Sequence, residues 1–121
     1  MAKVYAEFGI EIFDRTLLEQ CYNIMKPLGE VEIKETRRKT YIIDYHTNTI
    51  ETKEIEFLSN EIFEKINSVK DKLKRLIFSD KLYADICFVK VSDKNDVAIK
   101  INKKLISISH ELNLEINFDG F

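Results

Sequence analysis

The fold is decided by four runs near the C-terminus: LYADICFVKV (82–91), SDKND (92–96), VAIKI (97–101) and LEINF (114–118). The first and third runs are apolar and β-branched and are separated by turn-forming residues, which predicts two strands. Asn102 is a suitable N-cap for a short helix. LEINF alternates apolar and polar residues, as half-buried strands do. The sequence therefore predicts an α+β domain whose last strand belongs to the sheet.

The first strand has the same two-sided character. KVYAEFGIEI (3–12) places Val4, Ala6 and Phe8 on one face and polar residues on the other. A strand of this kind has one covered face and one open face. The residues expected on the open face are Tyr5, Glu7, Glu11 and Asp85.

The middle of the chain predicts a helix followed by short strands. Asp14 is a good N-cap for a helix that ends at Pro27. EVEIK (30–34) and YIIDY (41–45) then have high β-propensity. Residues 50–57 are ambiguous: the pattern slightly favours a polar edge strand, and a loop is the alternative.

The clearest helix begins after Ser59 or Asn60 and keeps an apolar stripe for about five turns, to Ile77. Residues 49–64 carry five glutamates and one lysine, whereas residues 65–81 carry six basic residues and two aspartates. Acid near the start of a helix and base near its end is the order that the helix dipole favours. Much of this charge asymmetry is therefore expected without any ligand.

Together these elements predict one α+β domain over residues 1–121. The expected architecture is a single antiparallel or mixed sheet of five to six strands with three helices packed on one face.

The net charge of −2 is too small to indicate nucleic acid or an anionic membrane as the partner. The N-terminus lacks the pattern of a signal peptide, so we expect a cytoplasmic protein. Cys21 and Cys87 lack metal-site or redox-motif spacing and are expected to be buried free thiols.

Three parts of the chain resemble the bacterial domain of unknown function 4279 family. They are the opening alternating strand, the long helix after residue 58, and the ending NKKLISISHELNLEINF (102–118), with a short helix and an alternating strand. The resemblance is best over residues 58–121. It implies a small bacterial domain without established catalytic residues. By analogy with other small bacterial domains, it implies an immunity protein that neutralises a toxin.

Catalytic patterns are weak throughout. His46 and His110 have no second ligand at the spacing that a zinc site requires, so no metal and no cofactor are expected. Asp85 could share the open face with Glu7 or Glu11 as a carboxylate pair, but carboxylates on a solvated face are the simpler interpretation. A basic run before Tyr41 is typical of single-strand nucleic-acid platforms, but it is only four residues long. We therefore expect a protein that is not an enzyme and does not bind nucleic acid.

The feature that best indicates a partner is the acidic stretch at 51–64. Carboxylates can occupy positions where a basic nuclease would bind phosphates, and they accelerate association. Aromatic neighbours would anchor the interface. The residues predicted to bind a partner are Tyr41, Tyr45, Glu51, Glu54, Glu56, Phe57 and Glu61.

The sequence leads to two hypotheses. The first is a non-catalytic protein-binding module, in the narrow form an immunity protein that occludes a basic toxin. The alternative is a small-molecule-binding regulatory module of the ACT-like or ferredoxin-like kind, because each half runs from strand to helix to strand. An exposed last strand would also permit a homodimer through edge-to-edge pairing.

Overall fold

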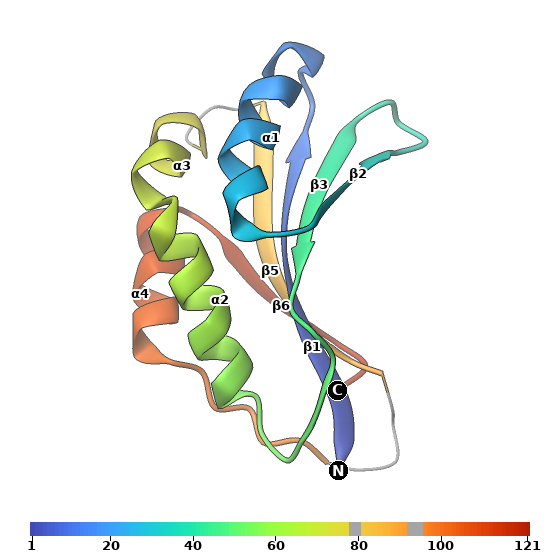
Figure 1. Cartoon of the computed structure of the whole chain (residues 1–121), viewed down its shortest axis with the longest axis vertical. Coiled ribbons are helices and arrows are strands. Elements are labelled where there is room, and N and C mark those ends of the chain that lie inside the picture. Colours follow the sequence, from blue (N-terminus) through green and yellow to red (C-terminus); the bar gives the residue numbers. More distant parts are fainter. Residues whose placement is uncertain (78–80, 92–95) are drawn as a thin grey trace.

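A computed structural model describes residues 1–77, 81–91 and 96–121 of the chain. The strands are β1 (Ala2–Ile12), β2 (Val31–Glu35), β3 (Tyr41–His46), β4 (Ile50–Thr52), β5 (Leu82–Lys90) and β6 (Glu115–Asp119). The helices are α1 (Leu18–Met25), α2 (Glu56–Ser68), α3 (Lys70–Ile77) and α4 (Lys103–Glu111), with short 3-10 turns η1 (Arg15–Leu17) and η2 (Lys26–Leu28). The helices cover one face of the sheet (Figure 1).

β1 lies at the centre of a mixed six-stranded sheet with the order β2-β3-β1-β5-β6, and β4 pairs with the first residues of β1. β5 and β6 are parallel, and the pairs of β1 with β3, β4 and β5 and of β2 with β3 are antiparallel. The parallel pair needs a crossover, which α4 supplies. With β4 left out and α2 and α3 counted as one broken helix, the elements from β1 to β5 follow the β-α-β-β-α-β order of ferredoxin-like domains. The prediction of an α+β domain with one mixed sheet is confirmed.

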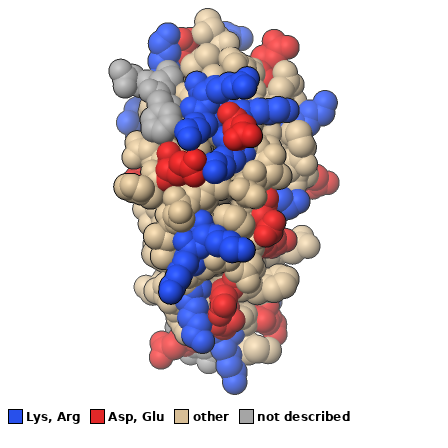
Figure 2. All heavy atoms as spheres, turned by 90° about the vertical axis from the view of Figure 1, so that its left-hand side faces the viewer, with Lys and Arg blue, Asp and Glu red and all other residues tan. Residues whose placement is uncertain are grey.

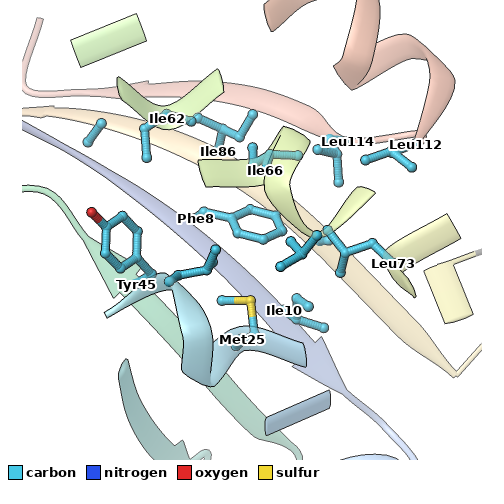
Figure 3. Packing of buried hydrophobic residues seen from close by; sticks show 14 of the residues in the cluster. Phe8, Ile10, Met25, Tyr45, Ile62, Ile66, Leu73, Ile86, Leu112 and Leu114 are labelled. Carbon is cyan, nitrogen blue, oxygen red and sulfur yellow. The ribbon is translucent and has the colours of Figure 1, made fainter. Parts of the chain in front are cut away.

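The core lies between the sheet and the helix layer. Alternate residues of β1, from Ala2 to Ile12, are all nearly or fully buried, which confirms the covered face that the alternation predicted. Phe8 packs at the middle of this layer, among side chains from the sheet and from α1, α2 and α3 (Figure 3). Tyr45 lies at the periphery of the cluster (Figure 3). Burial of this continuous apolar layer is the main stabilising term of the fold.

The predicted strand over residues 97–101 is wrong. Only Ala98 makes a bridge, to Glu54, and the described residues around it have no regular structure. β5 itself is confirmed, but its outer neighbour is β6, which reaches that position through α4. The position next to β5 that a hairpin partner would need is therefore taken. The expected turn at 92–96 falls mainly outside the described residues.

The long helix differs from the prediction at its start and in its middle. α2 begins at Glu56, so Ser59, which was expected as the N-cap, lies inside the helix. Ser59 is fully buried, and its hydroxyl accepts a hydrogen bond from the backbone N–H of Asn102 (2.7 Å). The helix then breaks at Val69, after Ser68, whose hydroxyl donates to the Lys65 carbonyl (2.6 Å). Serine and β-branched residues favour such interruptions. The described residues therefore contain four α-helices where three were predicted.

The remaining predictions are mostly confirmed. Asp14 caps η1 by accepting a hydrogen bond from the Thr16 N–H (3.0 Å), and Asn102 caps α4 in the same way. The edge strand that the pattern slightly favoured over residues 50–57 is wrong beyond Thr52: only β4 is a strand, and α2 already begins at Glu56. Both cysteines are free, but Cys87 is half-buried and not in the core. Among the described helices, none has the length and apolar character needed to cross a membrane.

Candidate functional site

The face of the sheet opposite the helices is strongly acidic. The strand register places eight carboxylates on it, against two lysines, Lys3 and Lys34, among the described residues. We call this surface the carboxylate face; its acids are Glu7, Glu11, Glu32, Asp44, Glu51, Asp85, Glu115 and Asp119. The open-face positions predicted for Tyr5, Glu7, Glu11 and Asp85 are confirmed.

A row of acids crosses the whole sheet at Gly9. Glu32 and Asp44 lie on one side of Gly9, and Asp85 and Glu115 lie on the other, each aligned with its neighbour in the register. A Cβ at Gly9 would lie 2.5 Å from Asp44 Oδ1 and 3.6 Å from Asp85 Oδ1. The missing side chain therefore allows both aspartates to lean over the central strand, and a close side-chain approach is a usual reason for glycine inside a strand.

Three carboxylates of this face have raised pKa values. Burial is the main cause for Glu7, Asp44 and Asp85, because it disfavours the charged form. Mutual repulsion adds to it: Asp44 and Asp85 raise the pKa of Glu7, and Asp85 raises that of Asp44. Lys34 and His46 oppose the shift of Asp44 without cancelling it. The centre of the carboxylate face therefore holds negative charge that its own surroundings leave only partly compensated.

The local hydrogen bonds orient some of these acids without neutralising them. Asn117 Nδ2 donates to Asp85 Oδ2 (3.0 Å), and the Thr40 hydroxyl donates to Glu11 Oε2 (2.7 Å). Lys34 Nζ lies 4.0 Å from Asp44 Oδ2, at the limit of an ion pair. Within the described residues, Glu7 and Asp85 make no salt bridge. Both acids are thus free to interact with a cation from outside the chain.

One part of the helix layer, on the opposite side of the sheet, is basic. α3 and α4 carry six basic residues and two acids, and Figure 2 shows clusters of basic side chains on this side of the molecule, with acidic side chains among them. Glu111 makes ion pairs with Lys70 (3.0 Å) and Lys74 (3.2 Å), which hold its pKa below the ordinary value. The helix layer as a whole is close to neutral, because α1 and α2 carry four acids and one lysine. The small net charge of the chain therefore hides an acidic sheet face and a basic surface on α3 and α4.

Neither cysteine has the properties of a reactive thiol. Cys87 lies on the carboxylate face, where burial and the nearby Glu7 and Asp85 raise its thiol pKa to about 11. Burial raises the pKa of Cys21 to the same value. A thiol that stays protonated at neutral pH is a poor nucleophile. No group of three or more His, Cys, Asp and Glu side chains among the described residues could hold a metal ion.

The residues predicted to bind a partner do not form one patch. Glu51 lies on the carboxylate face, opposite Lys3, whereas Tyr41 and Tyr45 point into the helix-covered side, where Tyr45 is only 7% exposed. Phe57 is the exposed aromatic of the set, at 63%, beside Glu56 in the first turn of α2. Glu54 lies in the loop between β4 and α2, with its Oε2 3.9 Å from Lys100 Nζ.

Tyr45 and Glu61 do come together, at a shallow groove of about 300 Å³ between the end of β3 and α2. Lys65 spans this groove: its Nζ donates to the Leu28 carbonyl (2.9 Å) and lies 5.4 Å from the centre of the Tyr45 ring. Burial and the nearby Glu61 raise the pKa of the Tyr45 hydroxyl. The groove is open and polar.

Sequence reasoning placed Glu7 and Asp85 on the open face but missed Asp44, the third acid at its centre. Asp44 was visible as the single acid inside the apolar strand YIIDY, which was a usable signal. Its alignment with Gly9 and Asp85 depends on the pairing of three strands that are distant in sequence. Glu115 joins the row only because β6 pairs in parallel with β5.

Comparisons of the chain with protein-family models, with curated proteins and with solved structures find no match. The resemblance to the domain of unknown function 4279 family therefore stays a prediction.

Proposed function

We propose that this chain is a non-catalytic protein-binding module whose carboxylate face receives a basic protein. In its narrower form the proposal is an immunity protein of the bacterial cytoplasm that neutralises a cognate toxin by occlusion. The partner would supply lysine or arginine side chains to Glu7, Asp44 and Asp85. No bond is made or broken in this mechanism.

One observation carries the proposal: three partly buried, mutually repelling carboxylates lie on adjacent strands of an uncovered sheet face. Like charges on neighbouring strands destabilise a sheet. A basic partner would relieve this repulsion on binding, and its desolvated ion pairs would be stronger than those of scattered surface acids. The absence of a low-pKa thiol supports binding over nucleophilic catalysis.

The test compares three tagged baits in a lysate of the source organism. They are the wild type, a neutral-face variant (Glu7→Gln, Asp44→Asn, Asp85→Asn) and a helix-control variant (Glu56→Gln, Glu61→Gln, Glu64→Gln). Both variants lose three negative charges, so they match in net charge. We expect the wild type and the helix-control variant to capture the same basic protein and the neutral-face variant to lose it.

The same captures separate the proposal from its competitors. A basic protein that is lost from the helix-control variant alone would move the site to the acidic stretch of α2. No stoichiometric protein on any bait would contradict the protein-binding function. For the immunity form, expression of the captured protein should arrest growth, and co-expression of the wild-type chain should restore it.

A regulatory small-molecule module is the second candidate, supported by the β-α-β-β-α-β element order and by the groove beside Tyr45. Fold-level likeness is a weak argument for function. A metabolite that raises the melting temperature of the wild type, and that loses this effect in Glu61→Gln, would favour this candidate. The neutral-face variant should respond to such a ligand as the wild type does.

A further inference from the structure

The outer edge of β2 is an unpaired strand edge at one end of the sheet. In the order of the sheet, no described strand lies beyond it (Figure 1). Four of its five residues are exposed, and the Ile33 side chain is 46% exposed although it follows the apolar face of the sheet. An exposed edge of this kind is a template for another strand.

The hydrogen-bond pattern shows which backbone groups point outward. Thr36 N donates to Thr40 O (2.9 Å) between β2 and β3, and Thr47 N donates to Ala6 O (2.9 Å) between β3 and β1. Bonded and non-bonded pairs alternate in antiparallel strands. Glu32 and Lys34 are therefore bonded to β3, and the free N–H and C=O groups of β2 belong to Val31, Ile33 and Glu35.

We propose that β2 pairs antiparallel with β2 of a second copy of this chain, with the two-fold axis at Ile33. In this register Ile33 faces Ile33 of the second copy, and Val31 faces Glu35. These are the residues whose backbone groups point outward, so the edge hydrogen bonds of both copies are satisfied. The pairing joins two six-stranded sheets, with their carboxylate faces on the same side.

Charge complementarity selects this register. With the axis at Ile33, Glu32 lies opposite Lys34 of the second copy, and by symmetry the pair occurs twice. A shift of one step in either direction places Glu32 opposite Glu32 or Lys34 opposite Lys34. Opposite charges in directly facing positions stabilise a strand pair, and like charges destabilise it. Within one chain Lys34 is held only loosely: its Nζ lies 3.6 Å from Glu32 Oε2 and 4.0 Å from Asp44 Oδ2. Lys34 can therefore pair with Glu32 of the second copy.

The other sheet edge does not fit a second copy in this way. β6 has the sequence EINFD and carries acids at both ends, with no lysine. Antiparallel self-pairing centred on Asn117 would place Glu115 opposite Asp119 of the second copy. In this register, pairing through the edge of the last strand, which the sequence suggested for a homodimer, is disfavoured by repulsion.

The test measures the oligomeric state by analytical ultracentrifugation over a wide range of concentrations. The wild type should dimerise reversibly. Glu32→Lys alone and Lys34→Glu alone should each weaken the dimer roughly ten- to hundredfold, because two attractive pairs become repulsive. Mixing these two variants should restore dimers, since every new charge then faces its opposite. The double variant Glu32→Lys/Lys34→Glu should dimerise as the wild type does.

Ile33→Pro provides a second test. Proline removes the outward N–H of Ile33 and leaves the hydrogen bonds to β3 intact, which an edge strand tolerates. It should abolish the dimer while circular dichroism and thermal unfolding show a folded chain. A wild-type monomer at all concentrations, or a dimer indifferent to Ile33→Pro and to both charge reversals, would overturn the proposal. These experiments measure only self-association and need no partner protein. A negative result would therefore contradict the dimer without contradicting the proposed function.

Discussion

Gly9 is the residue on which the centre of the carboxylate face depends. In Gly9→Ala the new methyl group would meet Asp44 Oδ1 at 2.5 Å, so the Asp44 carboxylate must move away. We expect the free energy of unfolding to change by no more than about 1 kcal/mol, because the lost freedom of the unfolded chain offsets the displacement. Affinity for the basic partner should fall at least tenfold. Chemical denaturation and calorimetry check the two values, and an unchanged affinity would argue against a role for Asp44.

The raised pKa values of Glu7, Asp44 and Asp85 predict how stability depends on pH. Between the ordinary carboxyl pKa and the raised one, the folded state binds more protons than the unfolded state. The free energy of unfolding should therefore increase as the pH falls from neutrality through the raised values. Asp14, whose pKa is lowered to about 2 by the Thr16 hydrogen bonds and by Lys81, acts oppositely and loses its contribution at more acid pH.

Denaturant titrations at a series of pH values measure this dependence. The neutral-face variant should be more stable than the wild type at neutral pH, by roughly 0.2–1 kcal/mol for each repulsive pair removed. Its stability should also change less on mild acidification. The helix-control variant should keep the wild-type dependence. A neutral-face variant that is less stable at neutral pH would contradict the repulsion that the proposed function relies on.

At the scale of elements, the junction of α2 with α4 shows a connection that the sequence did not indicate. The buried Ser59 hydroxyl accepts a hydrogen bond from the Asn102 N–H, and Asn102 in turn caps α4 through the N–H of Lys104 (2.7 Å). Ser59→Ala should cost about 1–3 kcal/mol, because the partly buried N–H of Asn102 loses its partner. Asn102→Ala should cost about 1 kcal/mol through the lost cap. The exposed Ser107→Ala serves as the control in the same denaturation series; equal costs for Ser59 and Ser107 would refute the link.

The elements also show where sequence reasoning succeeds and where it fails. β1 and β3 were predictable because alternation or β-propensity is strong within each segment. The VAIKI run (97–101) has the same propensity, yet β6 occupies the neighbouring edge of β5, so it has no strand partner. Ser59 looked like a cap, and only the packing of α4 against α2 explains its burial. The carboxylate row could not be predicted either, because it depends on contacts between distant segments. The open-face acids of β1 and β5 were predictable within each strand, but their alignment with Asp44 across Gly9 was not.

At the scale of the whole molecule, acid is concentrated on the sheet face, and base is concentrated on α3 and α4 within a helix layer that is close to neutral. A basic partner approaching the carboxylate face should therefore be attracted in one orientation, which raises the association rate more than the net charge suggests. We expect the association rate constant to fall steeply with added salt, because exposed charges are screened beyond about 8–10 Å. Stopped-flow measurements with the captured partner check this. An association rate independent of salt would contradict electrostatic steering.

The most direct test of the central claim is calorimetric titration of the purified partner into the three matched proteins. The carboxylate face predicts that the neutral-face variant binds at least a hundredfold more weakly than the wild type. The helix-control variant should bind within about threefold, since both variants lose the same charge. Wild-type affinity in the neutral-face variant would contradict the claim that Glu7, Asp44 and Asp85 receive the partner.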